Sequence, residues 1–332
     1  MRKYKYAIEM GGGYTSIYVN GQGLALKEPT LVAAEPTAEG YKVIALGIDA
    51  KKLIGKTKEN VEIFTPMPHM DHSNYEYSVV LLKHFLKKVD FRFDENAIFI
   101  IPCGLSSTEK QNILKVCDGA DLGHVELVPA PLCACIGGGR SIDNSKVNMV
   151  IDIGGSSTEI AVINMSNILK GATLGIGGKS IDASIVNFLA YSQNLVVGIS
   201  TAETLKKEVG SLYTNDTLNM EITGVDTHTK TPRTAVLFSN ELRQAIEPFY
   251  AEIVRSIDAT INALPPEIVA DIINSKILIV GGGAYMQGLE NYLKKNLNYP
   301  VEICEDCENA TILGAGKLIA DGSLLQGILN NL

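Results

Sequence analysis

The chain has 332 residues, of which 46% are hydrophobic and 20% are charged, so its length and composition suggest a globular protein with a large core and two domains or one duplicated unit. The formal charge is −8 and no long basic block occurs, which argues against nucleic acid as the main partner. Six cysteines without framework spacing favour reduced cytoplasmic thiols, and the lack of an apolar run of about 18 residues argues against a membrane span.

The first half of the chain alternates predicted strands and helices, which is the pattern of an α/β layered domain. Apolar runs with short turns between them predict strands at residues 6–10, 14–19, 30–34, 43–47, 97–102 and 125–128. Helical spacing of apolar residues predicts helices at 75–89, at 107–119 with Ser107 as the N-cap, and at 131–136.

The second half repeats this alternation. Strands are predicted at residues 150–153, 158–162, 218–224, 234–238, 277–280 and 301–303. Helices are predicted at 180–191, at 201–209 with Thr201 as the N-cap, and at 239–263, 286–297 and 311–320.

One local pattern occurs in both halves. An apolar strand ends in an acid, a glycine tip with hydroxyl residues follows, and a second apolar strand begins. The first copy has Glu9 before Gly11, Gly12, Gly13, Tyr14 and Thr15, and the second has Asp152 before Gly154, Gly155, Ser156, Ser157 and Thr158. Glycine lets backbone amides approach an anion closely, so each tip can wrap a phosphate. The neighbouring acid is suited to hold a cation or a water molecule.

Two further glycine turns follow predicted strands. One includes Gly177 and Gly178, and the other runs through Gly281, Gly282, Gly283 and Ala284. Four such turns in one chain, two of them duplicated, predict a nucleotide clamped between two similar halves. The two tips would hold its phosphates from opposite sides, and residues 281–283 would pass under the base or ribose.

In their order and spacing these motifs resemble the MreB family of bacterial actins, within the actin, sugar-kinase and heat-shock chaperone ATPase superfamily. The resemblance covers nearly the whole chain and is strongest at residues 152–159, 175–182, 281–289 and 313–316. It implies an α/β, duplicated actin-like (ribonuclease H-like) fold of two lobes with a nucleotide cleft between them. It also implies ATP and Mg²⁺ as cofactors, and self-association into cytoplasmic filaments that serve cell shape or scaffolding.

The same resemblance implies the division of the chain and the roles of further residues. The first lobe would cover residues 1–142 with a small insertion at about 31–72. The second would cover 143–320 with an insertion at about 181–240, before a C-terminal tail at 321–332. Asp152 and Glu9 would be the catalytic acids, and Asp152 would hold the Mg²⁺ shell. Glu203, Lys206 and Lys207 would reach the nucleoside, although an exposed ion pair within one helix is the alternative for Glu203 and Lys206.

Three departures from the family pattern affect the expected chemistry. Glu9 stands where the family has Asp, which moves the carboxylate by about 1.5 Å. Gly12, Gly13 and Tyr14 replace hydroxyl, small and amide residues. Pro129 and Ala130 replace an acidic pair, one member of which positions the hydrolytic water. Because losing such a group commonly costs about 10²–10⁴ in rate, we expect ATP binding with slow or absent hydrolysis.

Other functions and partners are weighed against this interpretation. A small-molecule kinase of the same superfamily would need an acid near the γ-phosphate, and the turn at 101–104 supplies none in sequence. A non-polymerising nucleotide-binding adaptor is a further alternative, kept open by Pro129 and Ala130. Phe91 and Phe93 lie beside cations and could contact a membrane surface, or both rings could pack onto the adjacent strand.

Overall fold

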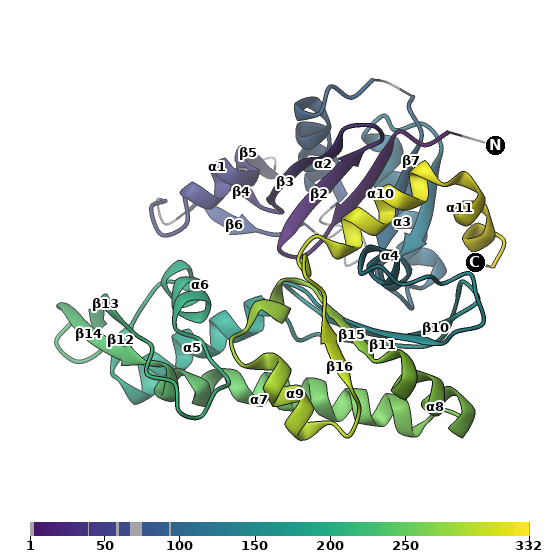
Figure 1. Ribbon diagram of the computed structural model, residues 1–332. Helices are drawn as coiled ribbons and strands as arrows, with labels where there is room; N and C mark the ends of the chain where they lie inside the picture. The colour runs from purple at the N-terminus through teal and green to yellow at the C-terminus, as the bar shows by residue number, and fades with distance from the viewer. Residues whose placement is uncertain (1–2, 39, 58–59, 67–74, 93, 332) are drawn as a thin grey trace.

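The computed structural model describes residues 3–331 apart from 39, 58–59, 67–74 and 93. Two five-stranded sheets within these residues have the same strand order and the same strand directions (Figure 1). The first is ordered β3 (Gly23–Pro29), β2 (Tyr14–Val19), β1 (Tyr6–Met10), β7 (Ala97–Ile101) and β8 (Val125–Pro129). The second is ordered β11 (Asn167–Leu174), β10 (Thr158–Asn164), β9 (Asn148–Ile153), β15 (Ile277–Val280) and β16 (Val301–Ile303).

In each sheet the first three strands form antiparallel pairs and the last two run parallel to the central strand. β1 pairs antiparallel with β2 and parallel with β7, as β9 does with β10 and β15. A parallel pair needs a crossover connection, which here contains an inserted small sheet in each half. The predicted duplication is therefore confirmed at the level of topology.

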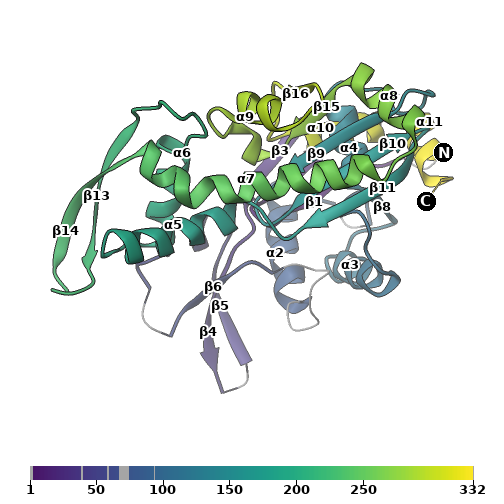
Figure 2. The same ribbon diagram turned by 90° about the horizontal axis from the view of Figure 1, so that it is seen from below.

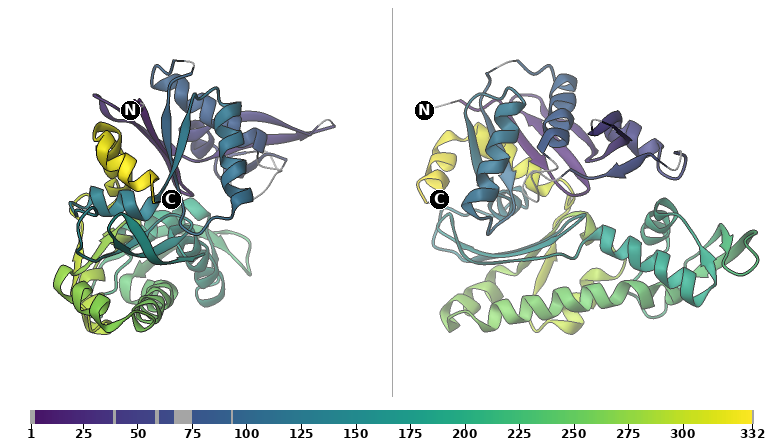
Figure 3. Two further views of the ribbon diagram at one scale, coloured as in Figure 1. Left: turned by 90° about the vertical axis from the view of Figure 1, so that its right-hand side faces the viewer. Right: turned by 180° about the vertical axis from the view of Figure 1, so that it is seen from behind.

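Each crossover carries a three-stranded antiparallel sheet. The first has the order β5 (Gly40–Leu46), β4 (Val32–Thr37), β6 (Glu62–Phe64), with α1 (Gly47–Lys52) after β5. The second has the order β12 (Leu195–Val196), β13 (Asn219–Asp226), β14 (Pro232–Phe238), with α5 (Gly178–Ser192) and α6 (Ile199–Glu208) before β13. Both lie at the same end of the molecule (Figures 1 and 3). The lobe limits at residues 142 and 320 and the insertion limits at 31–72 and 181–240 stay predictions.

Two helices, α4 (Ala130–Gly137) and α10 (Ala310–Ala320), lie between the two large sheets (Figure 1). Their backbones touch: a Cβ on Gly314 would lie 1.8 Å from the carbonyl oxygen of Cys133, and one on Gly137 would lie 1.7 Å from that of Ala310. The apolar cluster around these helices includes residues of both sheets, such as Ala7 and Val150. Although α10 falls within the predicted second lobe, it also contacts β1, β2 and β3 of the first sheet.

Other helices cover the outer faces of the sheets. The first sheet is covered by α2 (Tyr75–Lys88) and α3 (Ser107–Gly119). The 24-residue α7 (Ser239–Asn262) crosses the outer face of the second sheet, with α8 (Pro266–Ser275) and α9 (Leu289–Asn296) beside it (Figure 2). Each face of each sheet is thus buried against helices, which explains the nearly continuous apolar runs of β7 and β15.

Several predicted helix ends differ from the structure. The N-cap of α3 is Ser106, whose side chain accepts from the Glu109 amide in a capping box, and not Ser107. Helix α6 begins after Gly198 without a side-chain cap, so Thr201 lies inside it. The predicted helix at 286–297 is shortened, because a 3₁₀ turn at Gly282–Tyr285 precedes α9. The predicted tail contains one more helix, α11 (Gly322–Leu329), which buries Leu325 and Ile328.

Among the described residues, no single helix is long and apolar enough to cross a membrane. The pair α10 and α11 passes that test jointly by length and composition, but it is bent by 104°.

Candidate functional site

The two glycine tips meet in the space between the lobes. In the first hairpin Met10 pairs with Thr15, and the amide of Gly11 donates to the carbonyl of Tyr14 at 3.0 Å. In the second hairpin Ile153 pairs with Thr158, and the amide of Gly154 donates to the carbonyl of Ser157 at 2.9 Å. Both tips are therefore closed by the same backbone hydrogen bond. Each tip joins the central strand of its sheet to the antiparallel strand beside it.

Direct contact between the tips explains why glycine is needed there. A Cβ on Gly12 would lie 2.0 Å from Ser156 Oγ, and one on Gly155 would lie 2.9 Å from the backbone of Gly13. The turn at Gly177 packs on the same tip, because its Cβ would lie 2.7 Å from the Gly155 carbonyl carbon. The structure thus brings three of the four predicted glycine turns together.

The fourth glycine turn also reaches this site. Gly281 has φ +85°, and a Cβ there would lie 2.3 Å from Asp152 Oδ1. A Cβ on Gly283 would lie 2.2 Å from the side chain of Ile153. Residues 281–284, with Gly282 and Ala284 in the 3₁₀ turn, therefore pack against the end of β9 that carries Asp152.

Three carboxyl groups lie under the tips and influence one another. Burial, followed by the charge of Asp152, raises the pKa of Glu9 to about 8, against a smaller opposing effect of Lys27. Burial also raises the pKa of Asp152, and a 2.9 Å hydrogen bond from Thr311 Oγ1 partly offsets it. Burial raises the pKa of Glu159 to about 7, although its Oε2 accepts from the amide of Cys103 at 3.1 Å. Such a cluster would be stabilised by a cation.

The threonines that end the two tips already have hydrogen-bond partners. Thr15 and Thr158 are fully buried. The Thr15 hydroxyl bonds that of Thr30 at 2.9 Å, and the Thr158 hydroxyl donates to the carbonyl of Ile176 at 2.7 Å. The tips therefore offer mainly backbone amides, together with the partly exposed Ser156 and Ser157, for contact with a ligand.

The predicted nucleoside residues on α6 make ion pairs with different partners. Glu203 pairs with Lys207 at 2.7 Å and with Lys51 of α1 at 3.2 Å, across the cleft. Lys206 instead pairs with Asp182 at 2.7 Å and donates to the carbonyl of Gly178 at 2.9 Å. The alternative of an exposed Glu203–Lys206 pair is wrong. The nucleoside role of these three residues stays a prediction.

Two lysine side chains approach the ring of Tyr14, a grouping that the sequence did not predict. The ammonium groups of Lys27 and Lys51 lie 5.6 Å and 5.8 Å from the centre of its ring. Lys27 also pairs with Glu308 at 3.2 Å and donates to Asn309 Oδ1 at 2.6 Å. The signal available in the sequence was weak, because Lys51 lies outside every motif, and Lys27 lies in a segment that resembles the family but has no assigned role.

Pro129 and Ala130 stand where the resemblance predicts an acid that positions the hydrolytic water. Pro129 ends β8 and is the N-cap of α4, and Ala130 follows it, so neither supplies a polar side chain. The nearby Glu126 of β8 is already paired, because its Oε1 lies 2.6 Å from Nε2 of His124, the residue before the strand.

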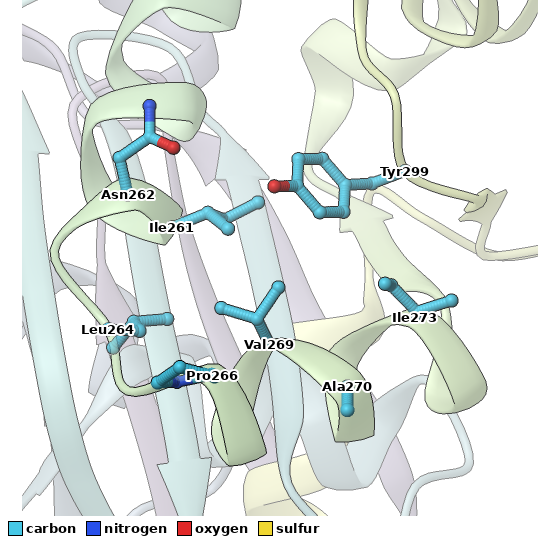
Figure 4. A pocket seen from close by; sticks show the side chains of 8 residues that line it. All are labelled: Ile261, Asn262, Leu264, Pro266, Val269, Ala270, Ile273 and Tyr299. Carbon is cyan, nitrogen blue, oxygen red and sulfur yellow. The ribbon is translucent and has the colours of Figure 1, made fainter.

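Three other features of the described chain lie apart from this site. Phe91 is half-buried with its ring 5.4 Å from that of Tyr6, whereas Phe93 lies outside the described residues. Among the residues described, no three metal-ligating side chains lie close enough together to hold a metal ion between them. A cavity of about 360 Å³ lies between the end of α7, α8 and Tyr299; its lining is mostly aliphatic, without carboxylates or cations, which does not suit a phosphate (Figure 4).

Comparison with known proteins agrees with this geometry. The family described as MreB/Mbl protein matches residues 3–326. The chain belongs to the MreB/Mbl family. The cell shape-determining protein MreB of Escherichia coli (strain K12) is 32% identical over 320 residues, which are 94% of this chain and 92% of that protein. The cell shape-determining protein Mbl of Bacillus subtilis (strain 168) is 32% identical over 317 residues, with 94% of each chain covered.

Solved structures extend the comparison to the fold. The crystal structure of MreB 5 of Spiroplasma citri bound to AMPPNP has a TM-score of 0.90 and 27% identity, covering 100% of this chain and 99% of that one. The MamK double helical filament has a TM-score of 0.76 at 18% identity, covering 97% and 99%, and shows the fold alone. The predicted actin-like fold is therefore confirmed, whereas the departures from the family pattern at the first hairpin and at Pro129–Ala130 stay predictions.

Proposed function

We propose that this chain is an actin-like cytoskeletal protein that binds ATP between its two lobes and polymerises into filaments. The observation that carries the proposal is the meeting of two equivalent glycine tips over the carboxyl groups of Glu9 and Asp152. Its relatives bear the description cell shape-determining, and the similar MreB 5 of Spiroplasma citri has been solved with AMPPNP and with ADP. These relatives support a cytoplasmic role in cell shape or scaffolding.

The phosphate-binding residues are proposed from the tips. The backbone amides of residues 11–15 and 154–158 would bind the β- and γ-phosphates, with the turn at Gly177 and Gly178 behind the second tip. Residues 281–284 would line the nucleoside side, with Glu203, Lys206 and Lys207 opposite. The Glu203 carboxylate is partly exposed at the cleft edge and would exchange its lysine partners for a ribose hydroxyl. Lys206 would contribute indirectly, by holding the carbonyl of Gly178 with a hydrogen bond.

Mg²⁺ suits the donor set, because Asp152 and Glu9 supply the oxygen ligands that this ion prefers. Asp152 would hold the ion through its water shell, and Glu9 would lie on the other side. When bound, the ion would neutralise charge on the phosphates. The three carboxyl groups with raised pKa values are an arrangement that a cation would relieve.

We propose that hydrolysis is slow or absent. Neither Pro129 nor Ala130 has a side chain able to orient a water molecule or accept its proton. Lobe closure on ATP would then favour subunit addition without a fast chemical step to reverse it. Head-to-tail contacts that do not close would extend the assembly into a filament.

The kinase alternative gains no support from the geometry. One acid, Glu159, does lie at the 101–104 turn. It is 8% exposed, and it accepts a hydrogen bond from the amide of Cys103. A pKa raised to about 7 suits a general base, but an acid this enclosed would first have to be reached by the substrate hydroxyl.

Sedimentation with ATP, with ADP and without nucleotide, followed by electron microscopy of the pellets, tests the proposed function. We expect filaments with ATP. Protein that stays monomeric in all three conditions while binding ATP would favour the adaptor alternative, and protein that binds no nucleotide would refute the proposal as a whole.

A further inference from the structure

The carboxylate of Asp152 is held on both sides by residues outside its own hairpin. Oδ2 accepts a hydrogen bond of 2.9 Å from Thr311 Oγ1. Oδ1 lies against the left-handed Gly281, where no side chain could fit. The side-chain orientation of Asp152 is therefore set by α10 and by the fourth glycine turn, and of these two contacts the one from Thr311 is a hydrogen bond.

Among the described residues, the Thr311 hydroxyl has Asp152 as its hydrogen-bond partner. It is 4% exposed in the first turn of α10. Buried threonines in helices often bond the carbonyl four residues earlier, as Thr260 does with Ser256 at 2.8 Å. The Thr311 hydroxyl instead crosses to another element, since its partner belongs to β9, 159 residues away. Valine would fill nearly the same volume, so packing alone does not explain a hydroxyl at this position.

The segment that carries Thr311 also reaches the first hairpin. Glu308 and Asn309 hold the ammonium of Lys27, which in turn lies over the ring of Tyr14. Three nearly consecutive residues thus connect the second hairpin, through Asp152, to the residue that follows the first tip.

This segment cannot shift independently of the core. The amide of Gly281 donates to the carbonyl of the fully buried Cys307 at 2.8 Å. On the other side Ala310 touches the backbone of Gly137, where a Cβ could not be accommodated. Thr311 is therefore presented to Asp152 by a fixed backbone, which is what a group that orients another side chain requires.

We propose that Thr311 is the positioning residue of Asp152, and that it orients the carboxylate for the water shell of a divalent cation bound with the nucleotide. This inference rests on the proposed function, since it assigns a role within the same site. In this role Thr311 acts through Asp152 and needs no contact with the nucleotide or the reacting atoms. Its hydroxyl fixes which carboxylate oxygen faces the cation, because Oδ2 is engaged and a lone pair of Oδ1 stays available.

The test is the dependence of nucleotide binding on Mg²⁺. Affinity for a fluorescent ATP analogue is measured for the wild type, T311V and T311S, both in EDTA and across a Mg²⁺ titration. Removing a partner of a metal ligand commonly costs about 10- to 100-fold in metal affinity. We expect T311V to raise the Mg²⁺ midpoint by about tenfold or more, to leave affinity in EDTA close to that of the wild type, and T311S to restore the wild-type midpoint.

A matched control separates this role from loss of a buried hydroxyl in general. T260V removes a hydroxyl of similar burial from α7, away from the site, and we expect no change in the Mg²⁺ midpoint. A wild-type Mg²⁺ midpoint in T311V, or equal shifts in T311V and T260V, would overturn the inference. If T311V does not fold, T311A compared with T311S gives the same contrast. If the wild type binds the analogue and T311V shows the same Mg²⁺ midpoint, only the role of Thr311 is refuted. If the wild type binds no nucleotide, both proposals are refuted.

Discussion

Replacing Gly12 with alanine would place a methyl group where the second hairpin already lies. The new Cβ would be 2.0 Å from Ser156 Oγ and 2.4 Å from Ser156 Cβ. Ordinary carbon–carbon contacts are about 3.5–4.0 Å, so the tips would have to separate by roughly 1 Å. Overpacking of this kind costs about 1–3 kcal/mol. If nucleotide needs both tips in their present positions, the cost corresponds to about a 5- to 150-fold loss of affinity.

The neighbouring glycine provides the comparison. A Cβ on Gly13 would lie 3.7 Å from the Gly155 Cα, an ordinary contact, so Gly13→Ala is expected to weaken binding much less. The double variant Gly12→Ala with Ser156→Gly removes both clashing atoms and should recover most of the affinity. Titration of a fluorescent ATP analogue measures all of these, and thermal unfolding of each variant identifies a general folding defect. Equal affinities for Gly12→Ala and Gly13→Ala would refute the reasoning that the tips act as one closed unit.

Three further predictions concern charge and chemistry. Because the pKa of Glu9 is raised from 4.5 to about 8, the folded chain without Mg²⁺ binds more protons than the unfolded one in this window, so its stability should fall as pH rises from about 4.5 to 8. Denaturant unfolding of Glu9→Gln should show a shallower slope, with the remainder due to Asp152 and Glu159, and an unchanged slope would contradict the prediction. The half-exposed Lys51–Glu203 pair should couple by about 0.5–1 kcal/mol in a double-mutant cycle with Lys51→Met and Glu203→Gln, and coupling that persists at high salt would argue against an ion pair. Ala130→Glu should raise phosphate release by about tenfold or more over both the wild type and Ala130→Gln, while wild-type protein that already hydrolyses as fast would show that another group positions the water.

Local features of the site could be predicted from the sequence, because each depends on a few adjacent residues. The hairpins at Glu9 and Asp152 depend on apolar runs and a glycine tip, and both form as expected. Helix ends were predicted less well: Ser106 has Glu109 three residues later, which is the spacing of a capping box, whereas Ser107 has Lys110, so the choice of Ser107 overlooked a pattern present in the sequence.

Contacts between distant residues could not be predicted in the same way. Glu203 and Lys206 share a helix, which suggested a pair, but their partners Lys51 and Asp182 come from other elements and decide their state. The hydrogen bond from Thr311 to Asp152 joins positions 159 apart, with no motif to mark it. Side-chain partners in a cleft depend on how sheets and helices are placed relative to one another, which periodicity does not specify.

The crossing of α4 and α10 has a consequence for how the molecule loses its structure. Their glycines allow backbone contact, and the apolar cluster around them draws residues from both large sheets. Neither half therefore has a complete interior of its own, since exposing one sheet removes the partner surface of the other. Heat should thus melt the two halves together in a single calorimetric transition, although their duplicated topology would suggest two independent ones.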